Sequence, residues 1–515
     1  MNAVTPLEKI VIVGGGTAGW MAVSLMQAAW PQAAISLVES EDIGVIGVGE
    51  GSTPYLRNFF RQLNIPESEW MPACHATFKC GIHFPNWSSK QGFEAYFHPF
   101  FSQLDLKTGN AFMQNACIRR RGGDVPAHPD DFWVSRYLAA QNKSPIPSVP
   151  LSFEPDYGYH FDSGLLGQFL KARALALGVS HQVATIDRVI QCNNGAIESI
   201  VTTIGDIIAG DFFVDCTGFA GLLVNKTLQV PFESYRDYLG NDRAVAIAGK
   251  IDGDKPLPSH TESEALSCGW AWKIPLAQRY GNGYVYDSKY LSETEAETEL
   301  RDHIGPSCEG MPARHLKLRV GRIEQHWCKN VLAVGLSQGF IEPLEATALM
   351  LIQYTLDRFI YSYERLLAGG DVAQTRDNFN DKVNANFDGI KDYIVAHYRL
   401  NSRTDSDYWI DNRNNKNISP RLQNILDAWD QGLDFEATLT QFKGELSYLR
   451  PSWYCLLAGM GRFPEKLQAV TPDEPVAALD DVRNYCEAMA NKFPSHRKYL
   501  QVIYAEHTER VSVTN

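Results

Sequence analysis

Near its start, the chain places an amphipathic stretch between two short apolar runs. The apolar runs are residues 9–13 and 35–39, and the stretch between them, residues 17–30, has apolar positions at helical spacing and stops before Pro31. Short apolar runs beside turn residues predict buried strands, and helical spacing predicts a helix. The pattern therefore predicts a strand–helix–strand unit with two parallel strands.

Further strand signals follow in the middle of the chain. Residues 183–216 are rich in β-branched residues and contain Asn194-Gly195, a dipeptide typical of a tight hairpin turn. Residues 330–335 carry a third strand signal. Two proline-bearing, aromatic-rich segments between these blocks are predicted to be inserted loops, namely residues 122–132 and 144–153.

The pattern changes at about residue 347. Residues 349–367 have helical periodicity, the chain beyond them is mostly amphipathic, and the polar segment 412–420 is predicted to be a long loop. We therefore predict two regions. Residues 1–350 form a discontinuous α/β nucleotide-binding module with inserted substrate-pocket loops, and residues 351–515 form a mainly helical region that covers the substrate.

Composition narrows the class of protein. The 515 residues are 44% hydrophobic and 21% charged, with Lys plus Arg 47 against Asp plus Glu 60, a net charge of −13. This balance excludes global disorder and argues against nucleic acid as a partner. Ten scattered cysteines without a Cys-x-x-Cys pair predict neither a disulfide framework nor a metal site. With no signal peptide or membrane-spanning stretch recognised, we expect a cytoplasmic protein without a membrane partner.

The glycine-rich segment after the first strand carries the clearest chemistry. GGGTAG, residues 14–19, has the G-x-G-x-x-G form, opens a helix, and is followed 20 residues later by Glu39 at the end of the next strand. Glycines let the backbone approach a pyrophosphate at a helix N-terminus, and the acid accepts hydrogen bonds from ribose hydroxyls. The residues predicted to contact a dinucleotide are Gly14, Gly16, Thr17, Ala18, Gly19 and Glu39.

Two more glycine positions are predicted to contact a flavin. Residues 47–54 are a second glycine-dense loop in which Gly49 and Glu50 are expected to approach a flat ligand such as an isoalloxazine, although an ordinary connection has the same composition. Gly335, at the end of the third strand, resembles a later FAD contact of glutathione-reductase-like flavoproteins. The fingerprint alone does not separate FAD from NAD. No second fingerprint is evident, so a bound FAD would have to receive electrons from another protein.

Residues 269–275 form the unusual string GWAWKIP. In a strand, Trp270 and Trp272 point to the same face, so two indoles would form one wall of a cavity. On composition alone, a pair of core tryptophans is the better explanation of the string.

This string is similar to the G-W-x-W-x-I-P signature of flavin-dependent halogenases. The chain also resembles the tryptophan halogenases at GGGTAG, at GVGE (47–50), around Lys79, at PLEAT (343–347) and at SWYCLLAG (452–459). The resemblance implies an α/β fold with a Rossmann-like, glutathione-reductase-like FAD module and a mainly helical C-terminal subdomain. It further implies a halogenase that uses FADH2, O2 and chloride or bromide to make hypohalous acid. A separate NAD(P)H-dependent flavin reductase would supply the FADH2 by diffusion.

The resemblance assigns roles at the reaction centre. Lys79 matches the family's active-site lysine, which either polarises hypohalous acid as an ammonium or forms a haloamine. Glu345 matches the second essential residue, which stabilises the cationic ring intermediate and accepts its proton. Glu342 is its nearest competitor. The amides of Thr347 and Ala348 lie where the family binds halide.

The resemblance also implies a substrate pocket. His98 and Phe100 match a His-x-Phe pair that stacks on the substrate ring, although both suit an ordinary core equally. The paired tryptophans would keep the substrate away from the flavin and so suppress monooxygenation. The residues expected to line the pocket are His98, Phe100, Trp270, Trp272 and Trp453.

The chain departs from the family pattern at two places. Glu-Ser-Thr-Gly appears here as EATA, residues 345–348, which leaves the choice between chloride and bromide open. Residues 432–450 lack the adjacent tyrosines that hold free tryptophan and contain only Tyr448. An indole or another electron-rich aromatic is therefore a better expected substrate than free L-tryptophan. The site of halogenation, carrier tethering and oligomeric state remain open.

Two other hypotheses compete with halogenation. A flavin-dependent monooxygenase of an aromatic substrate could use the same fold, but the paired tryptophans, the lack of an acid after Gly335 and the lack of a recognisable NAD(P)H site argue against it. A flavin-binding sensor or carrier-protein partner would bind FAD without turnover. The presence of both reactive residues argues against that class.

Overall fold

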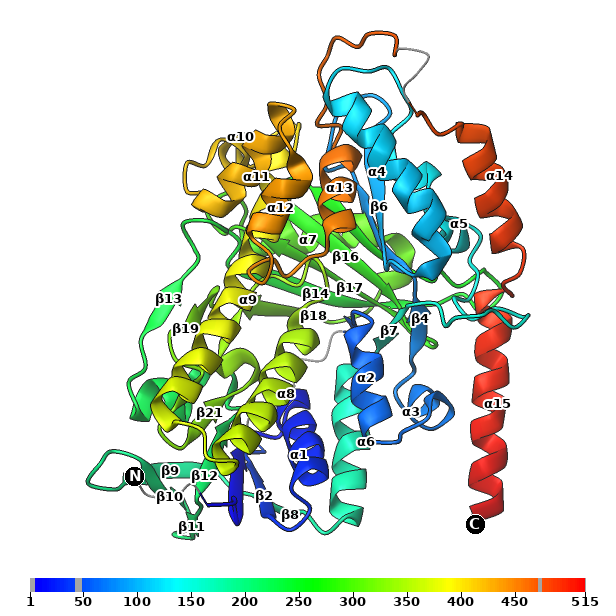
Figure 1. Ribbon diagram of the computed structural model, residues 1–515. Coiled ribbons are helices and arrows are strands. Elements are labelled where there is room, and N and C mark those ends of the chain that lie inside the picture. Colours follow the sequence, from blue (N-terminus) through cyan, green and yellow to red (C-terminus); the bar gives the residue numbers. More distant parts are fainter. Residues whose placement is uncertain (1–4, 42–48, 471–474, 515) are drawn as a thin grey trace.

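A six-stranded sheet carries the strand–helix–strand unit predicted at the start of the chain. The structure, a computed structural model, describes residues 5–41, 49–470 and 475–514 (Figure 1). The central strand β1 pairs in parallel with β2 on one side and β12 on the other, as predicted for the first two. The sheet order is β20 (Trp327–Cys328), β21 (Val331–Ala333), β12 (Phe212–Asp215), β1 (Lys9–Val13), β2 (Ala34–Glu39) and β8 (Ser180–Val183).

Three helices lie against one another beside this sheet. Helix α1 (Thr17–Ala29) packs between α6 (Ser163–Ala176) and α8 (Ala348–Leu367) (Figure 1). Helix α1 ends one residue earlier than predicted, and its apolar face, which includes Met21 and Met26, is buried in the main core. Helix α8 thus packs on the nucleotide-binding part, and the proposed boundary at residue 350 falls inside its first turn.

A seven-stranded sheet forms the second layer, above the first sheet in Figure 1. Its strands pair antiparallel except for β15 and β5, which are parallel. The order is β18 (Ala313–Lys317), β14 (Arg243–Lys250), β17 (Arg279–Tyr286), β16 (Gly269–Pro275), β15 (Thr261–Leu266), β5 (Gly81–Pro85) and β6 (Ala95–Pro99). This sheet places the tryptophan-rich strand β16 and the segment that follows Lys79, β5, on the two sides of β15.

Three small sheets complete the strands. One contains the predicted hairpin, in which β9 (Ile186–Gln191) and β10 (Ile197–Thr202) pair antiparallel around Gly195 at φ 75°. That φ lies in the left-handed region that glycine adopts readily, so the turn prediction is confirmed. The remaining strands of these sheets are β11 (Ile207–Ala209); β13 (Phe232–Ser234), β19 (Gly321–Ile323) and β22 (Gly339–Phe340); and β3 (Glu50–Gly51), β7 (Gly158–Phe161) and β4 (Thr77–Lys79).

Helices dominate the C-terminal third. The long helix α9 (Val372–Leu400) runs from the level of the first sheet to a group of helices beside the second sheet (Figure 1). That group comprises α10 (Asp407–Asn414), α11 (Pro420–Asp430), α12 (Phe435–Gln441) and α13 (Arg450–Gly459). The other helices that precede α8 are α2 (Tyr55–Gln62), α3 (Glu67–Ala73), α4 (Leu106–Arg120), α5 (Val134–Ala140) and α7 (Glu293–Ile304).

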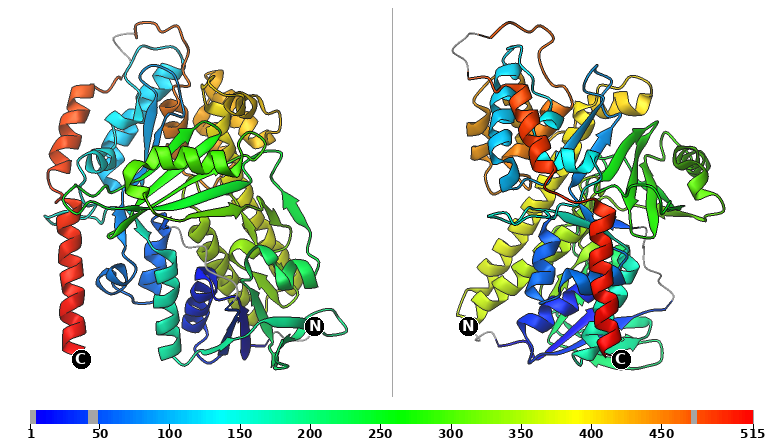
Figure 2. Two further views of the ribbon diagram at one scale, coloured as in Figure 1. Left: turned by 180° about the vertical axis from the view of Figure 1, so that it is seen from behind. Right: turned by 90° about the vertical axis from the view of Figure 1, so that its right-hand side faces the viewer.

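The last two helices lie on the outside of the molecule. Helices α14 (Leu479–Ala490) and α15 (His496–Thr514) follow one edge, and α15 packs along α3 (Figure 2). Among the residues that the structure describes, no helix combines the length and apolarity needed to cross a bilayer.

The loop predicted for residues 412–420 is wrong at its start. Helix α10 continues to Asn414, and the Asn412 side-chain amide donates to the carbonyl of Tyr408 one turn earlier. The polar side chain of Asn412 therefore bonds to its own helix, so a polar composition at this position is compatible with helix.

Candidate functional site

The glycine fingerprint forms an open cradle at the start of α1. The N-cap residue is Gly16, and no side chain of the described residues caps the first turn of α1, whose amides therefore suit an anion. A Cβ built on Gly16 would meet no atom within 4 Å, whereas a Cβ on Gly19 would lie 2.0 Å from the carbonyl oxygen of Gly14. Gly19 is therefore required for packing, and Gly16 leaves space beside the helix end, as a pyrophosphate needs.

Glu39 extends from the end of β2 across the fingerprint. A Cβ on Gly15 would lie 1.7 Å from Glu39 Oε2, so the glycine makes room for the carboxylate. Glu39 Oε1 accepts hydrogen bonds from Lys171 Nζ at 2.9 Å and His181 Nε2 at 2.7 Å. Oε2 bonds to none of the described residues, which leaves it available to a ribose hydroxyl. These groups fit the adenosine half of a dinucleotide.

The other predicted flavin contacts lie at two different places. Gly335, at φ 76° after β21, faces α1, because a Cβ there would lie 2.8 Å from the Cβ of Ala18. In the second glycine loop, Gly47 and Val48 lie outside the described residues, and Gly49 has φ 86°. The next residues form β3, which pairs with β7, and β7 also pairs with β4 on its other side, so the loop and β4 belong to one small sheet.

This loop touches the predicted catalytic lysine. A Cβ on Gly51 would lie 3.1 Å from Lys79 Nζ, so the missing side chain leaves room for the ammonium. Burial raises the pKa of the neighbouring Glu50 carboxyl to about 7, with a hydrogen bond from Ser163 acting in the opposite direction. The predicted flavin strap and the predicted catalytic residue are therefore adjacent.

Lys79 ends β4 with a fully buried side chain, at 0% exposure. Its Nζ has no hydrogen-bond partner among the described residues and lies 5.4 Å from the centre of the Phe100 ring. Burial lowers the pKa of the Lys79 ammonium to about 7, and the negative charge of Glu345 acts against that shift. A buried donor without a partner is costly, so this nitrogen is suited to bind a polar ligand.

Glu345 is held by two histidines. Its carboxylate is 3% exposed; His98 Nδ1 lies 2.9 Å from Oε2 and 3.1 Å from Oε1, and His397 Nε2 lies 3.3 Å from Oε1. Burial alone would raise the pKa of Glu345, but the His98 charge and the hydrogen bonds from both imidazoles outweigh it and lower the pKa to about 2. The carboxylate is therefore anionic at neutral pH, and His98 Nδ1 donates to it.

Glu342 has a different environment. Its Oε2 accepts hydrogen bonds from Asn241 Nδ2, Trp270 Nε1 and Tyr398 OH, at 3.1, 2.7 and 2.5 Å. Burial raises the pKa of Glu342, and these hydrogen bonds act in the opposite direction. One oxygen with three donors holds neighbouring side chains in place. Of the two candidate acids, Glu345 is the one in electrostatic contact with Lys79.

The segment after Glu345 leads directly into α8. Ala346 has φ 57°, a left-handed conformation that costs a non-glycine residue about 1–2 kcal/mol. Thr347 is the N-cap of α8 but its side chain caps no amide, and the helix begins at Ala348. The free first-turn amides of α8 suit an anion.

The two tryptophans of β16 share one face, as predicted. Their ring centroids are 6.1 Å apart, and Trp270 is fixed by its bond to Glu342. A Cβ on Gly283 of the neighbouring strand would lie 2.0 Å from the Trp272 ring, so this glycine creates the space that the indole fills. The Nε1 of Trp272 is buried without a partner among the described residues.

An aromatic group surrounds His98, which lies on the same face of the sheet as the two tryptophans. Tyr393 of α9 stacks on Tyr448 with ring centroids 3.7 Å apart, and meets Trp453 of α13 edge-on at 5.0 Å. The His98 ring lies 5.9 Å from Tyr393 and 6.4 Å from Tyr448. The predicted pocket residues His98 and Trp453 therefore belong to one group.

The sequence profile described as tryptophan halogenase matches residues 9–474 of this chain. The chain belongs to the tryptophan halogenase family. It is thus a flavin-dependent halogenase, an oxidoreductase, and the predicted fold class and family are confirmed.

Relatives of this halogenase match over nearly its full length. 7-Chloro-L-tryptophan 6-halogenase KtzR from Kutzneria sp. (strain 744) is 36% identical, covering 95% of this chain and 98% of that protein. The solved tryptophan 6-halogenase SttH from Streptomyces toxytricini has 32% identity and a TM-score of 0.82, covering 96% and 99%. BrvH, a flavin-dependent halogenase from Brevundimonas sp. BAL3, has 30% identity and a TM-score of 0.83, covering 97% and 99%.

Both ring nitrogens of His98, the residue predicted to stack on a substrate ring, are engaged in this halogenase. Nδ1 bonds to Glu345, and Nε2 lies 3.0 Å from Ser452 Oγ. The edge of the imidazole is occupied by hydrogen bonds, and its face remains the surface for ring contacts.

Sequence reasoning did not find His397, Tyr393 or Ser452. His397 Nδ1 donates to the carbonyl of Tyr393 at 2.9 Å, and Tyr96 OH lies 3.0 Å from its Nε2. These residues lie inside apolar helical stretches, where a histidine or tyrosine has the spacing of ordinary core residues. His397 and Tyr393 gain a role because α9 passes the Glu345 turn, and Ser452 gains one because α13 packs against β6.

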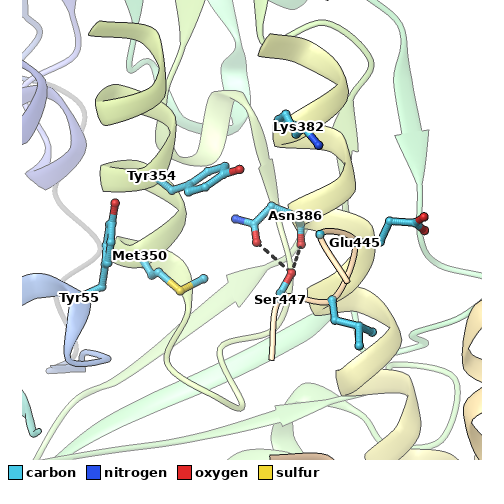
Figure 3. Close-up of a pocket in the computed structure, with 9 residues that line it drawn as sticks. Tyr55, Met350, Tyr354, Lys382, Asn386, Glu445 and Ser447 are labelled. Carbon is cyan, nitrogen blue, oxygen red and sulfur yellow. Dashed lines mark hydrogen bonds between the residues drawn. The ribbon is translucent and has the colours of Figure 1, made fainter. Parts of the chain in front are cut away.

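A cavity of about 260 Å³ lies between α2, α8 and α9 (Figure 3). Ser447 Oγ donates to Asn386 Oδ1 at 2.8 Å across one side of it. It is lined by Tyr55, Met350, Tyr354, Lys382, Asn386, Gly444, Glu445, Leu446 and Ser447. None of the predicted catalytic residues lines it, but the segment 444–447 continues into Tyr448 and so borders both the cavity and the aromatic group around His98.

Proposed function

We propose that this halogenase uses FADH2 and O2 to make hypohalous acid and directs electrophilic chlorination or bromination of an indole-like ring through Lys79 and Glu345. The observation that carries the proposal is the pairing of a buried ammonium, which has no hydrogen-bond partner among the described residues, with a buried carboxylate held by two histidines. A fully buried lysine without a partner is costly to retain unless a ligand uses it.

The cofactor would be held by the fingerprint and the glycines that follow it. The residues proposed to contact it are Gly14, Gly16, Thr17, Ala18, Gly19, Glu39, Gly49, Glu50 and Gly335. Bound and reduced, FAD supplies hypohalous acid from O2 and halide. A separate NAD(P)H-dependent flavin reductase is proposed to deliver the reduced cofactor.

Lys79 would activate the halogen donor. Its N–H groups donate to the oxygen of hypohalous acid, which draws electrons from the oxygen–halogen bond and leaves the halogen electrophilic. Because no described residue competes for Nζ, all three donor positions of the ammonium remain available. The aromatic carbon then forms a bond to the halogen as the oxygen leaves with its electron pair.

Glu345 would stabilise the cationic ring that results and accept its proton. Such a ring cation is a strong acid, so a carboxylate whose pKa is about 2 still takes the proton from the halogenated carbon. The hydrogen bond from His98 keeps one orientation of the carboxylate throughout. The released hydroxide combines with a proton to leave as water.

The surrounding residues would define the substrate. We propose that Trp270 and Trp272 separate the ring from the flavin, that His98, Phe100 and Trp453 contact the ring, and that the amides of Thr347 and Ala348 bind halide. Of the relatives named above, KtzR and SttH act on chlorotryptophan and tryptophan by name, whereas the name of BrvH gives no substrate. For this chain we propose a neutral indole-like ring, because Tyr448 is stacked on Tyr393 and is not one of two adjacent tyrosines.

The experiment is mass spectrometry of an aerobic reaction. It contains the protein, FAD, a flavin reductase with NADH, and either indole or L-tryptophan, with chloride and bromide in parallel. We expect the halogen isotope pattern on indole with the parent protein, none with Lys79→Ala, and an unchanged yield with the exposed control Lys255→Ala. An oxygenated product would favour the monooxygenase alternative, and halogenation of tryptophan alone would contradict the substrate class.

A further inference from the structure

Two histidines and a glutamate meet on the face of the second sheet that lies away from the paired tryptophans. Glu262 of β15 is the register partner of His83 on β5, and His260 precedes Glu262 by two residues. Cross-strand partners and residues two apart lie on one face of a sheet. The three side chains therefore converge, although His83 and His260 are 177 positions apart in the sequence.

The face can be assigned from the strand register. Ser263, the residue after Glu262, pairs with Trp272, and Ile82, the residue before His83, pairs with His98. Neighbouring residues of a strand point to opposite faces. The cluster of His83, His260 and Glu262 thus lies on the reverse side of the strands that carry the aromatic wall and His98.

The geometry of the cluster is close to that of a metal site. One ring nitrogen from each histidine and one carboxylate oxygen all lie within 4.8 Å of one another, and His83 Nδ1 is 3.9 Å from Glu262 Oε2. Bonds of about 2.0–2.2 Å to a tetrahedral cation would separate such atoms by about 3.3–3.6 Å. Small rotations of the side chains therefore bring the atoms to bonding distance.

The Nδ1 atom of His260 is buried without a partner among the described residues. His83 pairs with Glu262, and the ring centroid of His260 lies 6.1 Å from that of His83 and 6.2 Å from that of Phe97. Buried polar atoms without partners are uncommon and call for an explanation. His83 and Glu262 are 24% and 31% exposed, so a cation can enter from solvent.

We propose that His83, His260 and Glu262 bind a divalent transition-metal cation of the zinc type, with a fourth position open to water. Two imidazoles and one carboxylate are ligands that Zn²⁺ accepts, and an open fourth position is compatible with its coordination. The site is independent of the halogenation chemistry. By joining β5 to β15, a bound cation would hold the segment that directly follows Lys79.

The charges around the cluster are compatible with this proposal. The nearby cations have other contacts: Arg136 Nε donates to Asp130 at 2.7 Å, and Lys273 Nζ lies 5.2 Å from the centre of the Tyr280 ring. Lys273 is the register partner of Glu262, so its charge opposes the cation.

The test measures binding of Zn²⁺ alone by titration calorimetry, with untagged protein stripped by a chelator. One equivalent should bind to the parent protein, and His260→Ala or Glu262→Gln should weaken binding beyond the roughly 10–100-fold cost of losing an outer-shell partner. The matched control is His315→Ala, because His315 pairs with Glu297 at 2.9 Å but belongs to no group of three possible ligands among the described residues. The same stoichiometry and affinity in all of these proteins would overturn the proposal.

A second measurement keeps the test valid if a variant folds poorly. Zn²⁺ should raise the thermal midpoint of the parent protein and of Lys273→Gln, and in the latter it should bind more tightly, because an opposing charge is gone. Co²⁺ absorption distinguishes nitrogen and oxygen ligands from thiolates. A thiolate band, or equal Zn²⁺ affinity in Lys273→Gln and the parent protein, would contradict the site.

Discussion

His98 Nδ1 lies 2.9 Å from Glu345 Oε2, which connects a predicted ring contact to the predicted proton acceptor. The same imidazole reaches Ser452 Oγ through Nε2 at 3.0 Å. Hydrogen bonds thus connect Glu345, His98 and Ser452 in series. They link the turn before α8, strand β6 and helix α13. A change at His98 acts on the carboxylate even if the imidazole never touches the substrate.

Two substitutions separate these roles of His98. His98→Phe keeps an aromatic ring but removes the donor to Glu345, and His98→Asn keeps a donor near the position of Nδ1 but removes the ring. If the hydrogen bond to Glu345 contributes more to catalysis than the ring contact does, His98→Phe should lose at least about tenfold in product formation, and His98→Asn should retain more activity. The measurement is the rate of halogenated product at saturating and limiting substrate.

The pH dependence provides the control for this pair. Without the His98 donor and charge, the pKa of Glu345 should rise, so the acid limb of the pH profile should move to higher pH in His98→Phe. An unchanged acid limb together with a raised KM would mean that His98 acts only as a ring contact.

A substitution in the nucleotide cradle should change the affinity for FAD without changing the stability of the fold. Gly16→Ala should alter the free energy of unfolding by less than about 1 kcal/mol, because its Cβ meets no atom, and should weaken FAD binding by at least about tenfold. Gly19→Ala should instead destabilise the fold, because its Cβ would lie 2.0 Å from a backbone oxygen. Fluorescence titration with FAD and denaturant unfolding measure both effects.

The exposed Gly253→Ala serves as the matched control, since a Cβ there also meets nothing and no site residue is near it in sequence. Equal FAD affinity in Gly16→Ala and Gly253→Ala would exclude the cradle as the pyrophosphate site.

The sequence pattern predicted the structure correctly where residues close in sequence also contact one another in the fold. The fingerprint at residues 14–19 and the Asn194-Gly195 turn each depend on glycine conformations and strands within a few positions of one another. The facing of Trp270 and Trp272 follows from the period of a strand. In these cases the sequence neighbours are also the structural neighbours, so the spacing alone is informative.

Long-range contacts explain what the sequence did not reveal. Glu342 and Glu345 are three residues apart, and spacing and residue type do not distinguish them. In the structure, Asn241, Tyr398 and Trp270 donate to Glu342. His98 and His397 contact Glu345. The cluster of His83 and Glu262 likewise exists only because β5 and β15 pair in parallel. A strand pairing or a helix crossing between distant segments leaves no mark on either segment by itself.

The two glutamates should therefore respond differently to the same substitution. Glu342→Gln places an amide among three donors and should lower the free energy of unfolding by about 1–3 kcal/mol. Glu345→Gln should abolish most product formation while FAD binding is retained, because a neutral amide cannot accept the ring proton. Thermal unfolding and product mass spectrometry distinguish the two, and full activity in Glu345→Gln would exclude its proposed role.

Lys79 links stability to pH in the opposite sense from a salt-bridged lysine. Its pKa is lowered to about 7 by burial, so between about pH 7 and pH 10 the folded protein holds fewer protons than the unfolded chain. The free energy of unfolding should therefore rise with pH across this window. Lys79→Met should remove that slope and be more stable than the parent protein at pH 7 and below, by up to about 5 kcal/mol.

The same titration separates the two possible roles of Lys79 in catalysis. If the ammonium polarises hypohalous acid, the rate of halogenation should fall as the pH rises through about 7, whereas a haloamine route requires the free amine and should gain rate over that interval. The measurement is product formation from pH 6 to pH 9 with the flavin supply held in excess. If the profile is flat and Lys79→Met shows no gain in stability, the buried ammonium is not the group that titrates, and the lysine acts through its position rather than its charge.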